Sequence, residues 1–403
     1  MVDATCAGCG CACDDIEMTV VEGRLAGLTR TCALGDLWFA ERGGDRPPVA
    51  RLDGRTVSLD EAVEAAAAIL NQARVPLVYG LGQTSCEAQR RAVALAEAIG
   101  AVVDPAGSGA AQAAYQAIGS STATFGEIRD RAELVVGWRA DPVLTHPRLL
   151  GRLRLDRAGR GSRALVVIDA ERTATADEAD AFVALDATHD FEALWALRAL
   201  IGGAPLDRNR SGEVPLDGLD GLAERLVGAR HAAILYGAVD ELGALALFAL
   251  VRDLSRDRHA VTLGLRGDGN ARGAEDVLAW QTGFASAVSF ARGYPRANPG
   301  ELGAAALLER GEVDAALVVA SDPLEHLPSA AAERLRGLPT VAVDARATAT
   351  SRAARVAFAT AADGIEVPGT VHRMDGVPLP LRAPLAAERP GVADVLAAIA
   401  DRL

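Results

Sequence analysis

Short apolar runs, each followed by a glycine-containing loop and an amphipathic stretch, recur along most of the chain. Residues 76–81 are apolar, residues 87–99 have helical periodicity, and residues 101–103 are apolar again. An amphipathic helix with Ser58 as its N-cap is predicted before them, over residues 58–70. Buried strands that alternate with helices predict β-loop-α-β units, which form parallel sheets.

The same pattern returns in the second half of the chain. Residues 232–236 are apolar and are followed by Gly237, by a helical pattern over residues 242–255, and by apolar residues 260–263. The order strand, glycine, helix, strand therefore occurs twice. This repetition indicates a second α/β unit of the same kind.

Three pairs of segments match in the same order along the two halves: 75–80 with 232–237, 133–142 with 314–323, and 165–175 with 340–350. In the third pair, Asp169 and Asp344 each follow an apolar strand, and Thr173 and Thr348 stand four residues later. A further threonine follows at plus six in both segments. Matches in the same order indicate an internal duplication.

Turn-rich stretches suggest where the chain divides. We expect a linker at residues 41–57, a hinge at residues 206–218, a loop at residues 363–378 that wraps a domain edge, and a last helix over residues 392–403. The prediction is an α/β protein with a small N-terminal cysteine-rich β domain, two homologous parallel-sheet α/β domains and a C-terminal wrapping segment with its helix: residues 1–52, 53–205, 206–355 and 356–403.

Open parallel sheets bind ligands at the carboxyl ends of their strands, so we expect a site there. Two facing domains would hold a long, pseudo-symmetric ligand, and a duplication that serves stability alone is the alternative. His146 and Arg266 both follow predicted strand ends. We predict that Arg266 contacts an anionic group of the ligand. The alternative is that Arg266 is an ordinary solvated arginine of a loop.

Composition narrows the class of protein. The chain has 403 residues, half of them hydrophobic, and a net charge of −13, which argues against nucleic-acid binding. No apolar run is long enough to span a bilayer, and no secretory or twin-arginine signal is visible, so we expect a cytoplasmic protein. The sequence contains no lysine, which excludes a pyridoxal Schiff base, a Walker-A lysine and a lysine base.

Five of the six cysteines lie near the start of the chain: Cys6, Cys9, Cys11, Cys13 and Cys32. Between them, residues 16–20 and 24–28 predict two short strands joined by a turn, which would bring Cys32 back beside the first cluster.

Four of these cysteines, with Cys11 as a spare, form a possible ligand set: Cys6, Cys9, Cys13 and Cys32. Four thiolates suit either a tetrahedral zinc ion or a [4Fe–4S] cluster. Three close cysteines with a distant fourth favour the cluster, and a disulfide pair is the alternative.

The sixth cysteine and the histidines give weaker evidence for a functional site. Cys86 stands at a predicted helix N-terminus, which would lower its thiol pKa, although a lone cysteine without a nearby histidine is more often a buried small residue. The other histidines are scattered without the spacing of a zinc site.

Six segments together resemble one family: residues 6–15, 122–127, 280–283, 292–296, 320–323 and 369–375. They look like the B subunit of formylmethanofuran dehydrogenase, and the similarity runs nearly end to end. That family belongs with the molybdopterin oxidoreductases.

The resemblance implies an N-terminal [4Fe–4S] domain and two α/β domains that each hold a pterin-guanine dinucleotide, with tungsten or molybdenum between them. Cys6, Cys9, Cys13 and Cys32 would be cluster ligands. The segments of Asp169 and Asp344 would lie where the polar ends of the dinucleotides dock.

The chain departs from this family at the metal. Members that reduce CO2 carry a Cys-His pair, with the thiolate on the metal, shortly before the segment that matches residues 116–119. Here Gly107 and Ser108 stand at those positions, no cysteine follows Cys86, and no histidine precedes Thr145. Glycine offers no ligand and serine is a poor one for a soft metal, so redox chemistry at the metal is not expected.

The chain resembles a bacterial relative in lacking the Cys-His pair. This relative is the B subunit of the formyltransferase/hydrolase complex of methylotrophs, which resembles the B subunit of the dehydrogenase and has lost the redox site. The resemblance implies a non-catalytic scaffold subunit without a tungsto- or molybdopterin, whose cysteines hold [4Fe–4S], zinc or nothing. Its partners would be formyl hydrolase, formyltransferase and C-type subunits, which act on a methanofuran-like carrier. An active tungsten or molybdenum subunit and a stand-alone binding protein for a dinucleotide-like ligand are the alternatives.

Overall fold

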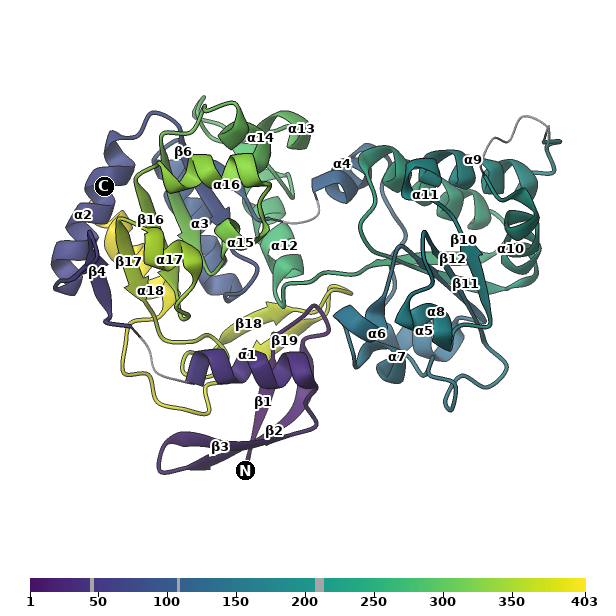
Figure 1. The fold of residues 1–403 in the computed structure, drawn as a ribbon, viewed down its shortest axis with the longest axis horizontal. Coiled ribbons are helices and arrows are strands. Elements are labelled where there is room, and N and C mark those ends of the chain that lie inside the picture. Colours follow the sequence, from purple (N-terminus) through teal and green to yellow (C-terminus); the bar gives the residue numbers. More distant parts are fainter. Residues whose placement is uncertain (44–46, 107–108, 207–213) are drawn as a thin grey trace. The chain divides into compact units, whose positions relative to one another are not determined.

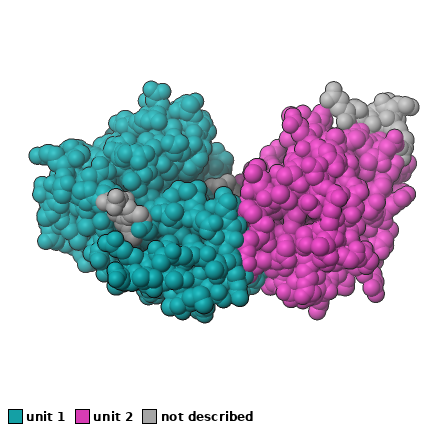
Figure 2. Space-filling view, turned by 60° about the horizontal axis from the view of Figure 1, so that its bottom comes forward, with its two compact units in different colours: residues 1–109, 268–403 teal, residues 110–267 magenta. Residues whose placement is uncertain are grey.

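The computed structural model describes four stretches of the chain: residues 1–43, 47–106, 109–206 and 214–403. They form two compact units, coloured separately in Figure 2: residues 1–109 with 268–403, and residues 110–267. Parts of the predicted linker and hinge, residues 44–46 and 207–213, lie outside the described residues. No helix among the described residues has both the length and the apolar character that crossing a membrane requires.

The first unit begins with a three-stranded antiparallel sheet followed by a helix: β1 (Val2–Cys6), β2 (Cys13–Val21), β3 (Arg24–Thr29) and α1 (Ala33–Gly43) (Figure 1). The predicted hairpin is confirmed as β2 and β3. Its turn places Glu22 at φ 50° and Gly23 at φ 74°, and two left-handed residues in a row suit the twist of a tight hairpin. Strand β1, which the sequence pattern does not predict, pairs with β2 and extends the hairpin to a three-stranded sheet.

The main sheet of the first unit has nine strands, which follow one another in space as β14 (Arg296–Ala297), β13 (Val288–Ser289), β7 (Val102–Asp104), β6 (Pro76–Gly80), β15 (Ala315–Val319), β16 (Thr340–Asp344), β17 (Val356–Ala359), β4 (Ala50–Leu52) and β5 (Arg55–Thr56). The central strands from β7 to β17 run parallel, and short antiparallel strands flank them. A separate hairpin pairs β18 (Gly369–His372) with β19 (Pro378–Leu381).

Helices cover both faces of this sheet: α2 (Leu59–Gln72), α3 (Cys86–Ala98), α12 (Ala271–Thr282), α13 (Pro299–Leu302), α14 (Ala304–Glu309), α15 (Pro323–His326), α16 (Ser329–Arg336), α17 (Ala349–Ala353) and α18 (Val392–Ala400). Successive strand residues point to opposite faces. Val78 therefore packs in the core under α2, α3, α12 and α18, while Leu77 and Tyr79 pack under α14 and α16.

The second unit contains one sheet of five parallel strands, in spatial order β10 (Ala181–Ala184), β9 (Ala164–Asp169), β8 (Leu134–Trp138), β11 (His231–Tyr236) and β12 (His259–Gly264). Its helices are α4 (Gly109–Ile118), α5 (Phe125–Arg131), α6 (Pro142–Thr145), α7 (Leu149–Arg152), α8 (Ala174–Glu178), a 3-10 helix (Ala187–His189), α9 (Asp190–Ile201), α10 (Leu216–Gly228) and α11 (Glu241–Leu254). Trp138 is fully buried in the core of this unit.

The predicted duplication is visible in the strand order, but the two halves of the chain are interleaved. The parallel strands run β7-β6-β15-β16-β17 in one sheet and β12-β11-β8-β9-β10 in the other, so the matched segments occupy equivalent places. Each set of five parallel strands takes two strands from one half of the chain and three from the other, because β6 pairs with β15 and β8 pairs with β11. The predicted domains, residues 53–205 and 206–355, are therefore not the units of the structure. Residues 1–52 and 356–403 belong to the first unit rather than standing apart.

Candidate functional site

The N-terminal cysteines converge where β1 meets β2. Cys6 ends β1, Cys13 begins β2, and the two are partners in the antiparallel register. A Cβ built on Gly35 of α1 would stand 3.2 Å from Cys6 Sγ and 3.9 Å from Cys32 Sγ. The hairpin thus brings Cys32 back beside Cys6, as the spacing predicts.

The thiols of this cluster interact electrostatically with one another. Burial raises the pKa of Cys6 to about 12, against a hydrogen bond from the Gly8 amide that lowers it, and the neighbouring Cys13, Cys9 and Cys32 raise it further. Such a group of thiols gives up its protons readily only to a cation that compensates the negative charge. Within the described residues, however, no three His, Cys, Asp or Glu side chains are placed to hold one metal ion.

The cysteine loop is fixed to the first unit by close backbone contacts. A Cβ at Gly269 would overlap the carbonyl oxygen of Ala7, so only glycine fits there. The Met374 amide donates to the carbonyl oxygen of Gly10 at 2.9 Å. The segment 369–375, which carries part of the family resemblance, therefore supports the cysteine loop.

The first unit has its topological switch point between β6 and β15, where ligands of open α/β sheets usually bind. A Cβ at Gly80 would lie 2.5 Å from the carbonyl oxygen of Val319 and 2.6 Å from Ser321 Cβ, so the two strand ends close on each other. Next to them, Gln83 Oε1 accepts a hydrogen bond from Arg42 Nη2 at 3.1 Å.

Asp344 and Thr348 use their polar groups within the chain. Asp344 accepts two hydrogen bonds from the guanidinium group of Arg346, from Nε at 3.2 Å and from Nη2 at 3.1 Å. Burial and, to a smaller extent, the nearby Arg346 lower the pKa of Arg42 to about 10, whereas Asp344 and Glu41 raise it. Thr348 is the N-cap of α17, and its hydroxyl accepts from the Ser351 amide at 2.9 Å.

The equivalent residues of the second unit behave in the same way. Thr173 is the N-cap of α8, and its hydroxyl accepts from the Ala176 amide at 3.2 Å. Asp169 lies 3.5 Å from Arg139 Nη1. Arg139 Nη2 forms a shorter ion pair, at 2.7 Å, with Asp190, and both of these side chains are 7% exposed. Burial raises the pKa of Asp190, although Arg139 lowers it.

A hydrogen-bonded motif that the sequence analysis missed explains the second threonine of each repeat. Asp141 Oδ1 accepts from the Thr175 amide at 3.0 Å and from its hydroxyl at 2.5 Å. Asp322 Oδ1 accepts from the Thr350 amide at 2.8 Å and from its hydroxyl at 2.6 Å. The repeated aspartate thus ties the end of one strand to the helix that follows the next strand.

His146 and Arg266 lie together in the second unit. His146 Nε2 donates to the carbonyl oxygen of Arg266 at 2.8 Å, and its Nδ1 lies 2.9 Å from the Thr145 hydroxyl. Burial lowers the pKa of His146, which favours the neutral ring. The half-buried Arg266 side chain lies against Gly264, where a Cβ would also stand 2.7 Å from the Tyr236 hydroxyl. His146 therefore links two loops of the second unit through its hydrogen bonds, which is a structural role.

Cys86 is buried at the start of α3, beside Asn270. Burial raises its pKa to about 11, so the expectation of a pKa lowered by the helix N-terminus is wrong and the buried small residue is the better description. Gly107 and Ser108, at the positions of the Cys-His pair in the CO2-reducing members, lie outside the described residues.

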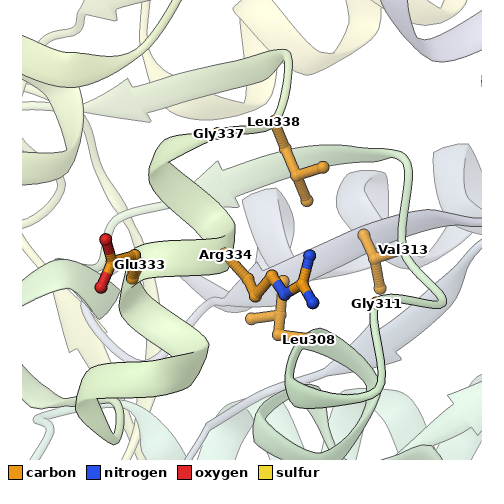
Figure 3. A pocket seen from close by; sticks show the side chains of 7 residues that line it. All are labelled: Leu308, Gly311, Val313, Glu333, Arg334, Gly337 and Leu338. Carbon is orange, nitrogen blue, oxygen red and sulfur yellow. The ribbon is translucent and has the colours of Figure 1, made fainter.

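One pocket of the first unit lies between α14 and α16 (Figure 3), lined by Leu308, Gly311, Val313, Glu333, Arg334, Gly337 and Leu338. Arg334 points into it, and Glu333 points away. Val313 and Leu338 stand two residues before β15 and β16, so the pocket is at the amino ends of these strands. It is therefore not the ligand crevice that the parallel sheet predicts.

Comparison with known proteins tests the resemblance. No family model matches the chain. The chain is 34% identical to the B subunit of the tungsten-containing formylmethanofuran dehydrogenase 2 of Methanocaldococcus jannaschii, over 94% of this chain and 92% of that protein. It is also 34% identical to the B subunit of the formyltransferase/hydrolase complex Fhc of Methylorubrum extorquens, over 67% of this chain and 74% of that protein.

A solved structure gives the same result. The chain matches a chain in the crystal structure of the formyltransferase/hydrolase complex FhcABCD of Methylorubrum extorquens with methylofuran, at a TM-score of 0.72 and 30% identity, over 88% of this chain and 98% of that one. These relatives include archaeal and bacterial proteins, so the resemblance found in the sequence is confirmed. The chain belongs to the family of formylmethanofuran dehydrogenase B subunits.

Proposed function

We propose that this chain is a non-catalytic, scaffold-like B subunit of a formyltransferase/hydrolase complex in one-carbon metabolism. The observation that carries the proposal is the pair Gly107 and Ser108, which stands where the CO2-reducing members of the family have Cys and His. A glycine cannot ligate a metal, and a neutral serine hydroxyl neither replaces a soft thiolate nor relays protons as imidazole does.

The residues predicted to dock the dinucleotides support the same conclusion. Asp344 is held by Arg346, and Asp169 lies 3.5 Å from Arg139 Nη1. The hydroxyl groups of the two predicted threonines cap helices. A pterin-guanine dinucleotide would have to displace these internal partners, so the described residues fit that cofactor poorly, and we derive no step through it.

The cysteines fit a different conclusion. We propose that Cys6, Cys9, Cys13 and Cys32 hold a [4Fe–4S] cluster. The proximity of their thiols supports a metal site, and three close cysteines with a distant fourth favour the cluster, with a zinc ion or no metal as the alternatives. When bound, such a cluster would supply a covalent cross-link between the cysteine loop and the start of α1.

We infer that the partners are formyl hydrolase, formyltransferase and C-type subunits, which act on a methanofuran-like carrier. The support is the similarity to a chain of the FhcABCD complex over 98% of that chain's length. The role of this chain would be to hold the catalytic subunits in place.

An active tungsten or molybdenum subunit is the second candidate. It is favoured by the retained N-terminal cysteines and by the 94% coverage in the alignment with the tungsten-containing archaeal relative. A stand-alone binding protein for a dinucleotide-like ligand is the third, and purification with and without the partner subunits separates it from the first.

The deciding experiment is anaerobic purification of the chain co-expressed with the three partner subunits, followed by elemental analysis for Fe, Zn, Mo and W and a visible spectrum. The proposal expects a stable complex with iron and without Mo or W. Mo or W near one atom per chain would overturn the scaffold proposal. Replacement of Cys32 by serine should lower the iron content, while Cys11→Ser, at the spare cysteine, should not.

A further inference from the structure

The segment 288–297 is a hairpin with an exposed tip at one edge of the nine-stranded sheet. Strand β14 is the edge strand and pairs only with β13 among the described strands. At the tip, Tyr294 is 53% exposed, and Arg292 and Arg296 are exposed on either side of it. An edge strand presents unpaired backbone donors and acceptors, which proteins commonly cover.

The two guanidinium groups of this hairpin have no carboxylate partner in the described part of the chain. No acidic residue occurs from residue 284 to residue 300, although the whole chain carries a net charge of −13. The hairpin is therefore a local positive site on an acidic protein. Arginine and tyrosine are also the residue types enriched at the energetic centres of protein interfaces.

The hairpin is held in a fixed conformation. Val288 and Phe290 are buried in the core of the first unit. Gly293 has a φ of 77°, and its amide donates to the carbonyl oxygen of Phe290 at 2.8 Å. A surface that is already ordered loses less conformational entropy on binding, which favours a specific contact.

The tip also lies away from the predicted ligand crevice. Ser289 pairs with Val102 at the amino end of β7, and the Phe290 amide donates to the carbonyl oxygen of Ala101 at 2.9 Å. Parallel sheets bind small ligands at the opposite, carboxyl end of their strands. An exposed position on a sheet edge, outside that crevice, suits a polypeptide partner better than a cofactor.

We propose that the β13–β14 hairpin is a docking surface for an acidic segment of another polypeptide of the complex. Carboxylates of that segment pair with Arg292 and Arg296, and Tyr294 packs against its backbone and aliphatic groups. The proposal rests on the proposed function, because the partner is sought among the subunits of the complex.

The test uses the full chain co-expressed with the formyl hydrolase, formyltransferase and C-type subunits. R292E/R296E and, separately, Y294A should each weaken the association of one or more of these subunits about tenfold or more. Higher salt should weaken the wild-type association in the same direction. The matched control is R55E, on the exposed strand β5 at the opposite edge of the same sheet, which should assemble like the wild type.

The outcomes distinguish the two proposals. A wild-type complex that is weakened only by the hairpin variants supports both. Equal assembly of wild type, R292E/R296E and Y294A overturns the docking surface and leaves the scaffold function standing. If the wild-type chain recovers none of the three subunits, both proposals are wrong. Thermal unfolding of the purified variants should match that of the wild type, because the changed side chains are exposed.

Discussion

Cys86 shows that burial can outweigh a helix N-terminus. Its thiol is enclosed beside Asn270, and burial raises its pKa from 9.0 to about 11. At pH 8 this shift makes the thiolate about a hundredfold rarer than in an ordinary thiol, and the thiolate is the reactive form. We expect iodoacetamide to alkylate Cys86 at least that much more slowly in the folded protein than in urea, as measured by peptide mass mapping. A rate in the folded protein equal to that in urea would contradict the structure.

His146 gives a prediction for the pH dependence of stability. Burial lowers its pKa in the folded chain, whereas the unfolded chain has the ordinary value of about 6.5. Below that value the unfolded state binds more protons than the folded state, so stability is lost as the pH falls through 6.5 toward the lowered pKa. We expect His146→Gln to reduce this loss between about pH 7 and 5, measured as melting temperature against pH. His189→Gln, in the same unit, is the control, and an unchanged slope in His146→Gln would count against this prediction.

At single residues, the structure adds a local role to the segments that the sequence singled out. The family resemblance implies that the segments of Thr173 and Thr348 lie where dinucleotides dock, and the structure shows both threonines as helix N-caps. The residue type itself is ambiguous, because threonine serves equally as a cap. The pairing of Arg139 with Asp190 could not be predicted, since 51 positions separate them and no periodic pattern relates them.

The repeated strand-to-helix motif makes a prediction at the scale of elements. Asp141 and Asp322 each receive hydrogen bonds from both the amide and the hydroxyl of a threonine in the next repeat segment. Replacement of either aspartate by alanine removes a charged acceptor and leaves buried donors without a partner, at a cost of about 2 to 4 kcal/mol. The two losses should add, because the residues lie in separate units.

Chemical unfolding of D141A, D322A and the double variant measures these effects. The asparagine variants should lose less, because an amide oxygen can still accept. The exposed Glu325→Ala, on α15 next to Asp322, is the control and should change stability by less than about 0.5 kcal/mol. A double variant no less stable than the single ones would show that the two motifs are not independent.

Elements with a strong local pattern can be predicted, and those without one cannot. The hairpin of β2 and β3 follows from alternation around a Glu-Gly turn, and α2 follows from its cap at Ser58. Strands β13 and β14 have only two residues each, too few for any periodicity to appear. The exposed hairpin that they form is visible only once β7 is in place beside it.

At the scale of the whole molecule, the sequence revealed the duplication but not its arrangement. Strand β6 pairs with β15 across more than 230 residues, while the nearer β8 belongs to the other unit. Both β8 and β15 are buried and apolar, so composition does not say which of them β6 will join. Matched repeats therefore predict two similar sheets, and only the tertiary structure shows that each sheet draws on both halves of the chain.

This interleaving predicts which fragments can fold. The segment 110–267 contains all five strands of its sheet and its own apolar core. The segments 53–205 and 206–355 each contain strands of both sheets and lack the partners of β6, β8, β11 and β15. We expect the segment 110–267 to unfold cooperatively when it is followed by circular dichroism and calorimetry. The segments 53–205 and 206–355 should show no cooperative transition. A parallel sheet that lacks its central neighbour exposes apolar surface and unpaired backbone groups. Cooperative unfolding of the segment 53–205 would mean that the halves are independent domains, and that β6 does not need β15 as its neighbour.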